Sequence, residues 1–195
     1  KEWRILDESI EPDMEYLKTV ADGELSIASR TLADRMWVVA YVMDDGPVRY
    51  YLYDREAKKA EFLFTNRKDL EGLPLVSMHP VVIETRDGLE MVSYCTLPAG
   101  SDPDGDGRPA QPQPMVLVVH GGPWGRDAWG YNPVHQWLAN RGYAVLSPNF
   151  RASTGFGKAF VNAGNMEWGR KMQDDLTDAV NWAVGEGIAA EDRVA

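Results

Sequence analysis

The residues best placed for chemistry form the turn His120-Gly121-Gly122, which directly follows the apolar run Met115–Val119. A valine-rich run of this kind predicts a strand buried on both faces of a sheet. Glycines at the carboxyl end of a parallel strand leave backbone N–H groups open, and such groups can stabilise negative charge on an oxygen atom. The turn is therefore a candidate site for anionic charge, although a plain loop explains two glycines and a following proline equally well.

The sequence offers no obvious catalytic partner for this turn. The nucleophile elbow Gly-x-Ser-x-Gly does not occur. Ser153 stands beside Gly155 in a loop, but it has no base within sequence reach, so we do not expect it to be a nucleophile. His79, in a linker, and His135, in a helix, are expected to be structural or exposed rather than general bases.

An acidic stretch, Asp102–Gly107, matches the first half of a calcium-binding loop. The second half fails, because Gln113 stands where a bidentate glutamate is needed and Pro109 and Pro112 disturb the backbone. The sequence therefore predicts a solvated surface turn here, and no metal site.

Composition limits the classes of function. The chain has 195 residues, of which 44% are hydrophobic, enough for a packed core. Its 20 basic and 30 acidic residues give a formal net charge of -10, which disfavours binding to nucleic acid or to an anionic membrane. The single cysteine, Cys95, excludes an internal disulfide and a thiolate metal cluster. A peptide or small-molecule ligand is compatible with all of these totals.

The first part of the chain is typical of an antiparallel meander, such as one blade of a β-propeller. Polar turns separate three short strands, expected at Arg35–Met43, Val48–Tyr53 and Glu61–Phe64. Residues 1–34 are expected to supply strands of a neighbouring blade. Leu70–Met78 carries Gly and Pro without a period and is the expected linker.

The second part changes to a different pattern. Pro80–Arg86 and Leu89–Leu97, joined by Asp-Gly, predict a hairpin. The alternation that follows predicts a parallel sheet covered by helices. Its segments are a strand from Met115, a helix after Asn132, a strand at Tyr143–Ser147, a helix spanning Met172–Ala183 and the entry to a strand at Asp192–Ala195. In the first of these helices Val134, Trp137, Leu138 and Arg141 share one face.

The sequence resembles the prolyl oligopeptidase family, and most closely its acylaminoacyl peptidase and dipeptidyl aminopeptidase branch. The resemblance covers nearly all of the chain and is specific from residue 115 onward. It is carried by the stretches His120–Trp124, Asn140–Leu146, Asn149–Gly157, Asp174–Leu176 and Arg86–Leu89.

The resemblance implies a serine peptidase in which a β-propeller caps an α/β-hydrolase domain. Residues 1–75 would be the end of the propeller, and residues 76–195 the first part of the hydrolase domain. Such enzymes cleave short peptides, or acylated or dipeptidyl amino termini, with a Ser-Asp-His triad and without a metal or cofactor. The elbow would follow a strand beginning at Arg193, so the triad would lie beyond Ala195 and the chain alone would be inactive.

The resemblance also implies roles for the turn. Gly122 would donate its N–H to the oxyanion, Gly121 would keep the backbone approachable, and Trp124 would contact the substrate. His120 stands where other branches have a tyrosine whose hydroxyl supports the oxyanion, so the donor here would be backbone. Ala152 departs from the family pattern, which has glycine at this position in the loop.

Three readings remain open at this point. The chain is part of a peptidase, an inactive truncated interaction module, or part of an esterase on the same scaffold. A sheet without its fifth strand would leave a hydrophobic edge exposed. We therefore expect the remaining carboxyl-terminal segment or a second chain to complete it, and a homo-oligomer is possible. The propeller-like segment favours a peptide substrate.

Overall fold

The computed structural model describes residues 3–195. The chain forms two compact units, Lys1–Pro74 and Leu75–Ala195, and each is treated by itself. The boundary falls inside the segment expected to be a linker. None of the helices in the described range is long and apolar enough to cross a bilayer.

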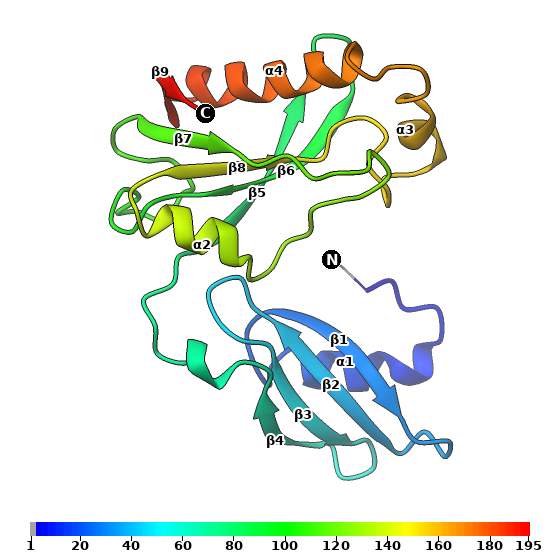
Figure 1. Cartoon of the computed structure of the whole chain (residues 1–195). Helices are drawn as coiled ribbons and strands as arrows, with labels where there is room; N and C mark the ends of the chain where they lie inside the picture. Colours follow the sequence, from blue (N-terminus) through cyan, green and yellow to red (C-terminus); the bar gives the residue numbers. More distant parts are fainter. Residues whose placement is uncertain (1–2) are drawn as a thin grey trace. The chain divides into compact units, whose positions relative to one another are not determined.

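The first unit is a four-stranded antiparallel sheet in the order β1-β2-β3-β4, with a short helix packed against it (Figure 1). Strongly β-forming residues fill the central strands, and polar turns join them. In chain order the elements are η1 (Glu8–Ile10), α1 (Glu11–Leu17), β1 (Glu24–Arg30), β2 (Met36–Val42), β3 (Arg49–Asp54), β4 (Lys59–Thr65) and η2 (Lys68–Leu70).

The segment before β2 differs from the prediction that residues 1–34 supply strands of a neighbouring blade. Met14 and Leu17 lie on α1 and are buried against Trp37 and Tyr53 of the sheet. Pro12 in the first turn, with acidic residues beside it, starts this helix. The strand that follows, β1, joins the same sheet as β2 rather than a separate one.

The second unit is a five-stranded mixed sheet in the order β5-β6-β8-β7-β9. The pairs β5–β6 and β6–β8 are antiparallel, whereas β7 is parallel to both of its neighbours, β8 and β9. Its elements are β5 (Met78–Glu84), β6 (Glu90–Thr96), β7 (Gln113–Leu117), α2 (Pro133–Ala139), β8 (Ala144–Pro148), α3 (Lys158–Asn162), α4 (Lys171–Gly185) and β9 (Ala189–Val194). An antiparallel sheet is followed by a sheet with helices, as the sequence predicts, but this second sheet is mixed and only the β8-β7-β9 part is parallel.

The last strand corrects one expectation. The sequence predicts only a strand entry at Asp192, or at Arg193 by resemblance, and a sheet that lacks its fifth strand. Strand β9 instead begins at Ala189 and is hydrogen-bonded along β7. The buried Ala189, after the turn at Gly187 and Ile188, already belongs to it. The two alanines at the start of β9 follow α4 closely, and such small residues carry no strand signal in the sequence.

Helices cover both sides of this sheet, with α4 on one side and α2 on the other (Figure 1). The asparagine N-cap of α2 forms as predicted, because the Asn132 side chain accepts hydrogen bonds from two backbone amides in the first turn. The predicted apolar face is wrong, however: Val134 and Trp137 are exposed, whereas His135 and Ala139 are buried. Hydrogen bonds of His135 to the sheet turn the helix this way.

Strand β7 ends at Leu117, earlier than the apolar run suggests. Only Met115 is fully buried, and Val119 is 41% exposed. The prediction of a strand buried on both faces is therefore wrong for its carboxyl end. The backbone leaves the sheet at this point and leads into the turn at His120.

Candidate active site

The turn at His120-Gly121-Gly122 lies just beyond the carboxyl end of β7, between its parallel neighbours β8 and β9. Both glycines are exposed. Within residues 3–195 neither glycine amide donates a backbone hydrogen bond. Two N–H groups are therefore open to a ligand at the edge where a parallel sheet offers its binding crevice.

Gly122 is required by the shape of the turn. Its φ of +143° lies outside the range that most residues adopt, and a Cβ there would come within 2.5 Å of the Trp124 amide nitrogen. A Cβ on Gly125 would come within 2.7 Å of the Gly121 carbonyl oxygen, so the chain doubles back tightly. By contrast, a Cβ on Gly121 would meet nothing within 4 Å, which leaves space beside its backbone.

The His120 ring is held from two directions. It stacks on Phe150 with ring centroids 4.7 Å apart and an interplanar angle of 20°. Its Nε2 lies 2.9 Å from the Oγ of Ser153, whose hydroxyl donates to the Phe150 carbonyl oxygen at 2.6 Å. The His120 Nδ1 lies 3.1 Å from the Gly121 carbonyl oxygen, so the ring links the Ser153 hydroxyl to the backbone of the turn.

Ser153 therefore has a histidine beside it, which the sequence did not reveal. The expectation that it lacks a nearby base is wrong in space, since the two residues meet across 33 positions of chain. Ser153 is nevertheless 0% exposed, and its hydroxyl donates a hydrogen bond to a backbone carbonyl oxygen. A buried hydroxyl cannot reach the carbonyl carbon of a substrate, so it is not placed to act as a nucleophile. Ser153 supports the turn and does not attack a substrate.

The loop carrying Ser153 clamps the whole turn. The Asn149 side chain accepts from the Asp127 amide at 2.8 Å and donates to the Asp127 carbonyl oxygen at 3.3 Å. The Thr154 amide donates to the Gly125 carbonyl oxygen at 2.8 Å. The stretches His120–Trp124 and Asn149–Gly157, which carry the family resemblance as separate motifs, are therefore two sides of one structure.

Arg151 anchors this clamp to the rest of the sheet. Its Nη2 lies 2.6 Å from Asp175 on α4 and 2.7 Å from Asp87 in the hairpin turn. The arginine is almost fully buried, and these two carboxylates raise its pKa while it holds the pKa of Asp87 well below its usual range. The sequence pattern named all three residues but not their contact.

Asp127, a few residues after the turn, has a carboxylate oxygen without a hydrogen-bond partner within the described chain. This oxygen, Oδ2, is buried. Burial raises the pKa of this carboxyl above its usual range, and the nearby His120 opposes the shift. A buried carboxylate oxygen without a hydrogen-bond partner costs free energy, so the ionised form of Asp127 is disfavoured here.

Trp124 projects from the same turn and is 61% exposed. Its ring lies 6.5 Å from that of Trp168, in the segment between α3 and α4. Together with Met166 and Arg170 they line an open cavity of about 580 Å³. Nothing in the sequence pattern indicates that these two tryptophans are neighbours. The role of Trp124 in substrate contact stays a prediction.

The two other histidines lie away from the turn. His135 is buried between Thr96 and Ser147, with its Nδ1 2.9 Å and its Nε2 2.7 Å from their hydroxyl oxygens, and burial lowers its pKa to about 4. It joins α2 to β6 and β8. His79 lies on β5, 3.7 Å from Asp102.

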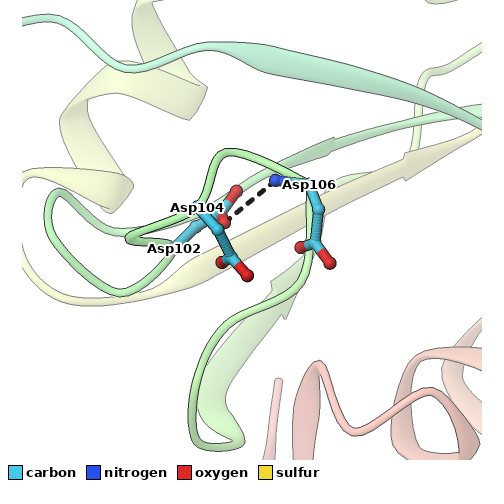
Figure 2. A group of neighbouring side chains, drawn as sticks. All are labelled: Asp102, Asp104 and Asp106. Atoms are coloured by element: carbon cyan, nitrogen blue, oxygen red, sulfur yellow. Dashed lines mark hydrogen bonds between the residues drawn. The ribbon is translucent and has the colours of Figure 1, made fainter.

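The acidic loop brings three carboxylates together, from Asp102, Asp104 and Asp106 (Figure 2). Their oxygens lie within 4.8 Å of one another. The Asp102 carboxylate is used by the loop itself, because it accepts from the amides of Gly105, Asp106 and Gly107. This is the bonding of a surface turn, as the sequence predicts.

Known proteins are similar to this chain in sequence. Residues 129–195 match the family model described as "Prolyl oligopeptidase family". Dipeptidyl aminopeptidase BIII of Pseudoxanthomonas mexicana is 54% identical over 194 residues, which cover 100% of this chain and 28% of that protein. The chain belongs to the prolyl oligopeptidase family.

A second relative is also similar over nearly the whole chain. Dipeptidyl peptidase family member 6 of Caenorhabditis elegans is 41% identical. The match covers 98% of this chain and 28% of the Caenorhabditis protein. The chain thus spans little more than a quarter of the length of these two relatives.

Solved structures share the fold. The acylaminoacyl peptidase of Pyrococcus horikoshii superimposes with a TM-score of 0.68 at 20% identity, covering 89% of this chain and 27% of its own. Dipeptidyl peptidase 4 of Porphyromonas gingivalis superimposes with a TM-score of 0.69 at 18% identity. The match covers 90% of this chain and 25% of the Porphyromonas protein.

Proposed function

We propose that this chain forms the oxyanion-binding wall of a serine peptidase that hydrolyses short peptides, or acylaminoacyl or dipeptidyl amino termini, by acyl transfer. In this proposal the second unit is the first part of an α/β-hydrolase domain and the first unit is the end of a β-propeller. The observation that carries it is the pair of open amides of Gly121 and Gly122 at the carboxyl end of β7.

The chemistry follows from that geometry. Attack on a peptide carbonyl places negative charge on its oxygen, and a fixed N–H at that position lowers the barrier by about 3 kcal/mol. The Gly122 amide is the proposed donor, because its turn is fixed by steric contacts and by the clamp from the Ser153 loop. His120 acts by holding the backbone and does not transfer a proton in this scheme.

The chain's own serines do not supply the nucleophile. The sequence holds no Gly-x-Ser-x-Gly elbow, and Ser153 is buried. We therefore propose that the 195 residues alone do not turn over a substrate, and that a Ser-Asp-His triad from the remainder of the protein completes the site. The names of the relatives, a dipeptidyl aminopeptidase and a dipeptidyl peptidase among them, support this class of reaction.

The test uses the protein that carries this chain. It is assayed on dipeptidyl, acylaminoacyl and simple ester chromogenic substrates, before and after one equivalent of a phosphonofluoridate that modifies activated serines. We expect turnover of the peptide substrates that the reagent abolishes. Turnover of esters alone would indicate an esterase, and absence of any turnover in a folded protein would indicate an interaction module.

A further inference from the structure

Three large apolar side chains gather at one place in the second unit. Trp124 is 61%, Trp168 65% and Met166 90% exposed. Exposed apolar side chains that cluster in this way mark binding surfaces rather than ordinary protein surface. Met166 also has a φ of +63°, a left-handed conformation that residues other than glycine seldom adopt.

This aromatic cavity is lined by Trp124, Gly164, Asn165, Met166, Trp168 and Arg170, and Trp124 joins it to the turn at Gly122 along the chain. Trp124 follows Gly122 by two residues, so their Cα atoms are at most about 7 Å apart. A peptide whose scissile carbonyl oxygen meets the Gly122 amide would therefore have its neighbouring residues close to the Trp124 backbone.

Both walls of the aromatic cavity are fixed to the same loop. The Trp124 wall belongs to the turn clamped by Ser153 and Asn149. The Trp168 wall is held through Gly164, where an added Cβ would approach the Cβ of Ala152 to 2.4 Å. The two backbone segments that carry the indoles are therefore both packed against the Asn149–Gly157 loop, which suits a largely preformed subsite.

Size and charge decide the occupant. A volume of about 580 Å³ suits one or two side chains of a small ligand, whereas a stable protein interface buries about 800 Å² on each partner. Arg170 is the only ionisable residue in the lining, and within residues 3–195 it makes no ion pair. A guanidinium disfavours a cationic side chain, whereas two indoles favour an apolar or aromatic one.

We propose that Trp124, Trp168, Met166 and Arg170 form a specificity subsite for a large apolar, preferably aromatic, side chain next to the scissile bond of the peptide. This inference rests on the proposed function and names the substrate class of that same site. It assigns Trp168, Met166 and Arg170 a role in substrate selection.

The experiment measures kcat/KM in the full-length protein that carries this chain, using peptide substrates that differ in one residue. Phe, Ala and Lys are compared on the acyl side of the scissile bond and, in a second series, on the leaving-group side. We expect Phe to be preferred over Lys in one of the two series, which identifies the side that the cavity serves.

Variants then test the residues. In Trp168→Ala the ratio of kcat/KM for the Phe and Ala substrates should fall about tenfold. Arg170→Glu should raise the ratio of the Lys to the Phe substrate about tenfold. Trp137→Ala, which removes an exposed tryptophan on α2, is the matched control and should leave all ratios unchanged.

The outcomes separate the two claims. Absence of any peptide turnover in the wild-type protein would contradict the proposed function. Turnover with unchanged Phe, Ala and Lys ratios in Trp168→Ala and Arg170→Glu would overturn the subsite and leave the proposed function standing. Because both side chains are exposed, thermal unfolding should confirm that the variants fold.

Discussion

The imidazole Nε2 of His120 lies 2.9 Å from the Oγ of Ser153, and that serine donates its own proton to the Phe150 carbonyl oxygen. The pair looks like the start of a catalytic dyad, but burial of the hydroxyl and the direction of its proton give it a different role. It fixes the backbone of the turn whose amides face outward. A histidine–serine contact in this fold therefore serves to position the turn.

The first prediction concerns this contact. Ser153→Ala leaves the Phe150 carbonyl and the imidazole without their partner, and an unsatisfied buried group costs about 1–3 kcal/mol. In the full-length protein we expect kcat to fall about tenfold or more with little change in KM, because the amide that meets the oxyanion loses its support. The exposed Ser29→Ala is the control. A rise in KM at constant kcat would point to substrate binding instead.

The second prediction concerns the anchor at Arg151. Asp175→Asn removes a fully buried carboxylate from this arginine and should lower the free energy of unfolding by about 3–5 kcal/mol. The neighbouring Asp174→Asn breaks only an exposed pair with Arg86 and should change it by less than about 1 kcal/mol. Urea unfolding measures both. Equal effects of the two substitutions would contradict a buried anchor.

The third prediction follows from His135. Its pKa is lowered to about 4 in the folded chain by burial, whereas the unfolded chain has an ordinary value near 6.5. The unfolded state therefore binds the proton first as pH falls, so stability is complete above about pH 6.5 and declines toward pH 4. The loss should approach about 3 kcal/mol.

His135→Gln should remove this part of the pH dependence, whereas His79→Gln should retain it. Thermal unfolding at a series of pH values between 7 and 4 gives the comparison. A wild-type protein whose stability stays constant over that interval would show that the histidine is not held neutral.

The fourth prediction tests the contact between Gly164 and Ala152. A Cβ at Gly164 would meet the Ala152 Cβ at 2.4 Å and the Met172 Cε at 2.8 Å, so Gly164→Ala should destabilise the fold by about 1–3 kcal/mol. Adding Ala152→Gly removes the methyl group in conflict and also relieves a φ of +81°. The double variant should therefore recover part of the loss. If the changes in the free energy of unfolding of the two single variants simply add in the double variant, the contact is contradicted.

The sequence predicted the elements that depend on local pattern. The Asn132 cap, the hairpin turn at Asp87 and the apolar repeat of α4 each follow from residues close together in the chain. Ala152, which stands where the family pattern has glycine, has a φ of +81°, in the range that favours glycine.

Contacts between segments that are distant in the chain could not be predicted from local sequence patterns. Nothing local indicates that His120 meets Ser153, or that Trp124 meets Trp168. The inward face of α2 was misassigned for the same reason, because two hydroxyl partners on the sheet draw His135 inward against the apolar pattern. Side-chain partners supplied by the sheet decide which face is buried.

The central claim is that the Gly122 amide receives the oxyanion, and the most direct measurement is kcat of Gly122→Ala in the full-length protein on a dipeptidyl substrate. A Cβ within 2.5 Å of the Trp124 amide nitrogen must shift the turn. The account predicts a loss of about 10²–10³ in kcat. Gly185→Ala, at a glycine with open space around it, should keep wild-type activity. A folded Gly122→Ala protein with wild-type kcat would contradict the account.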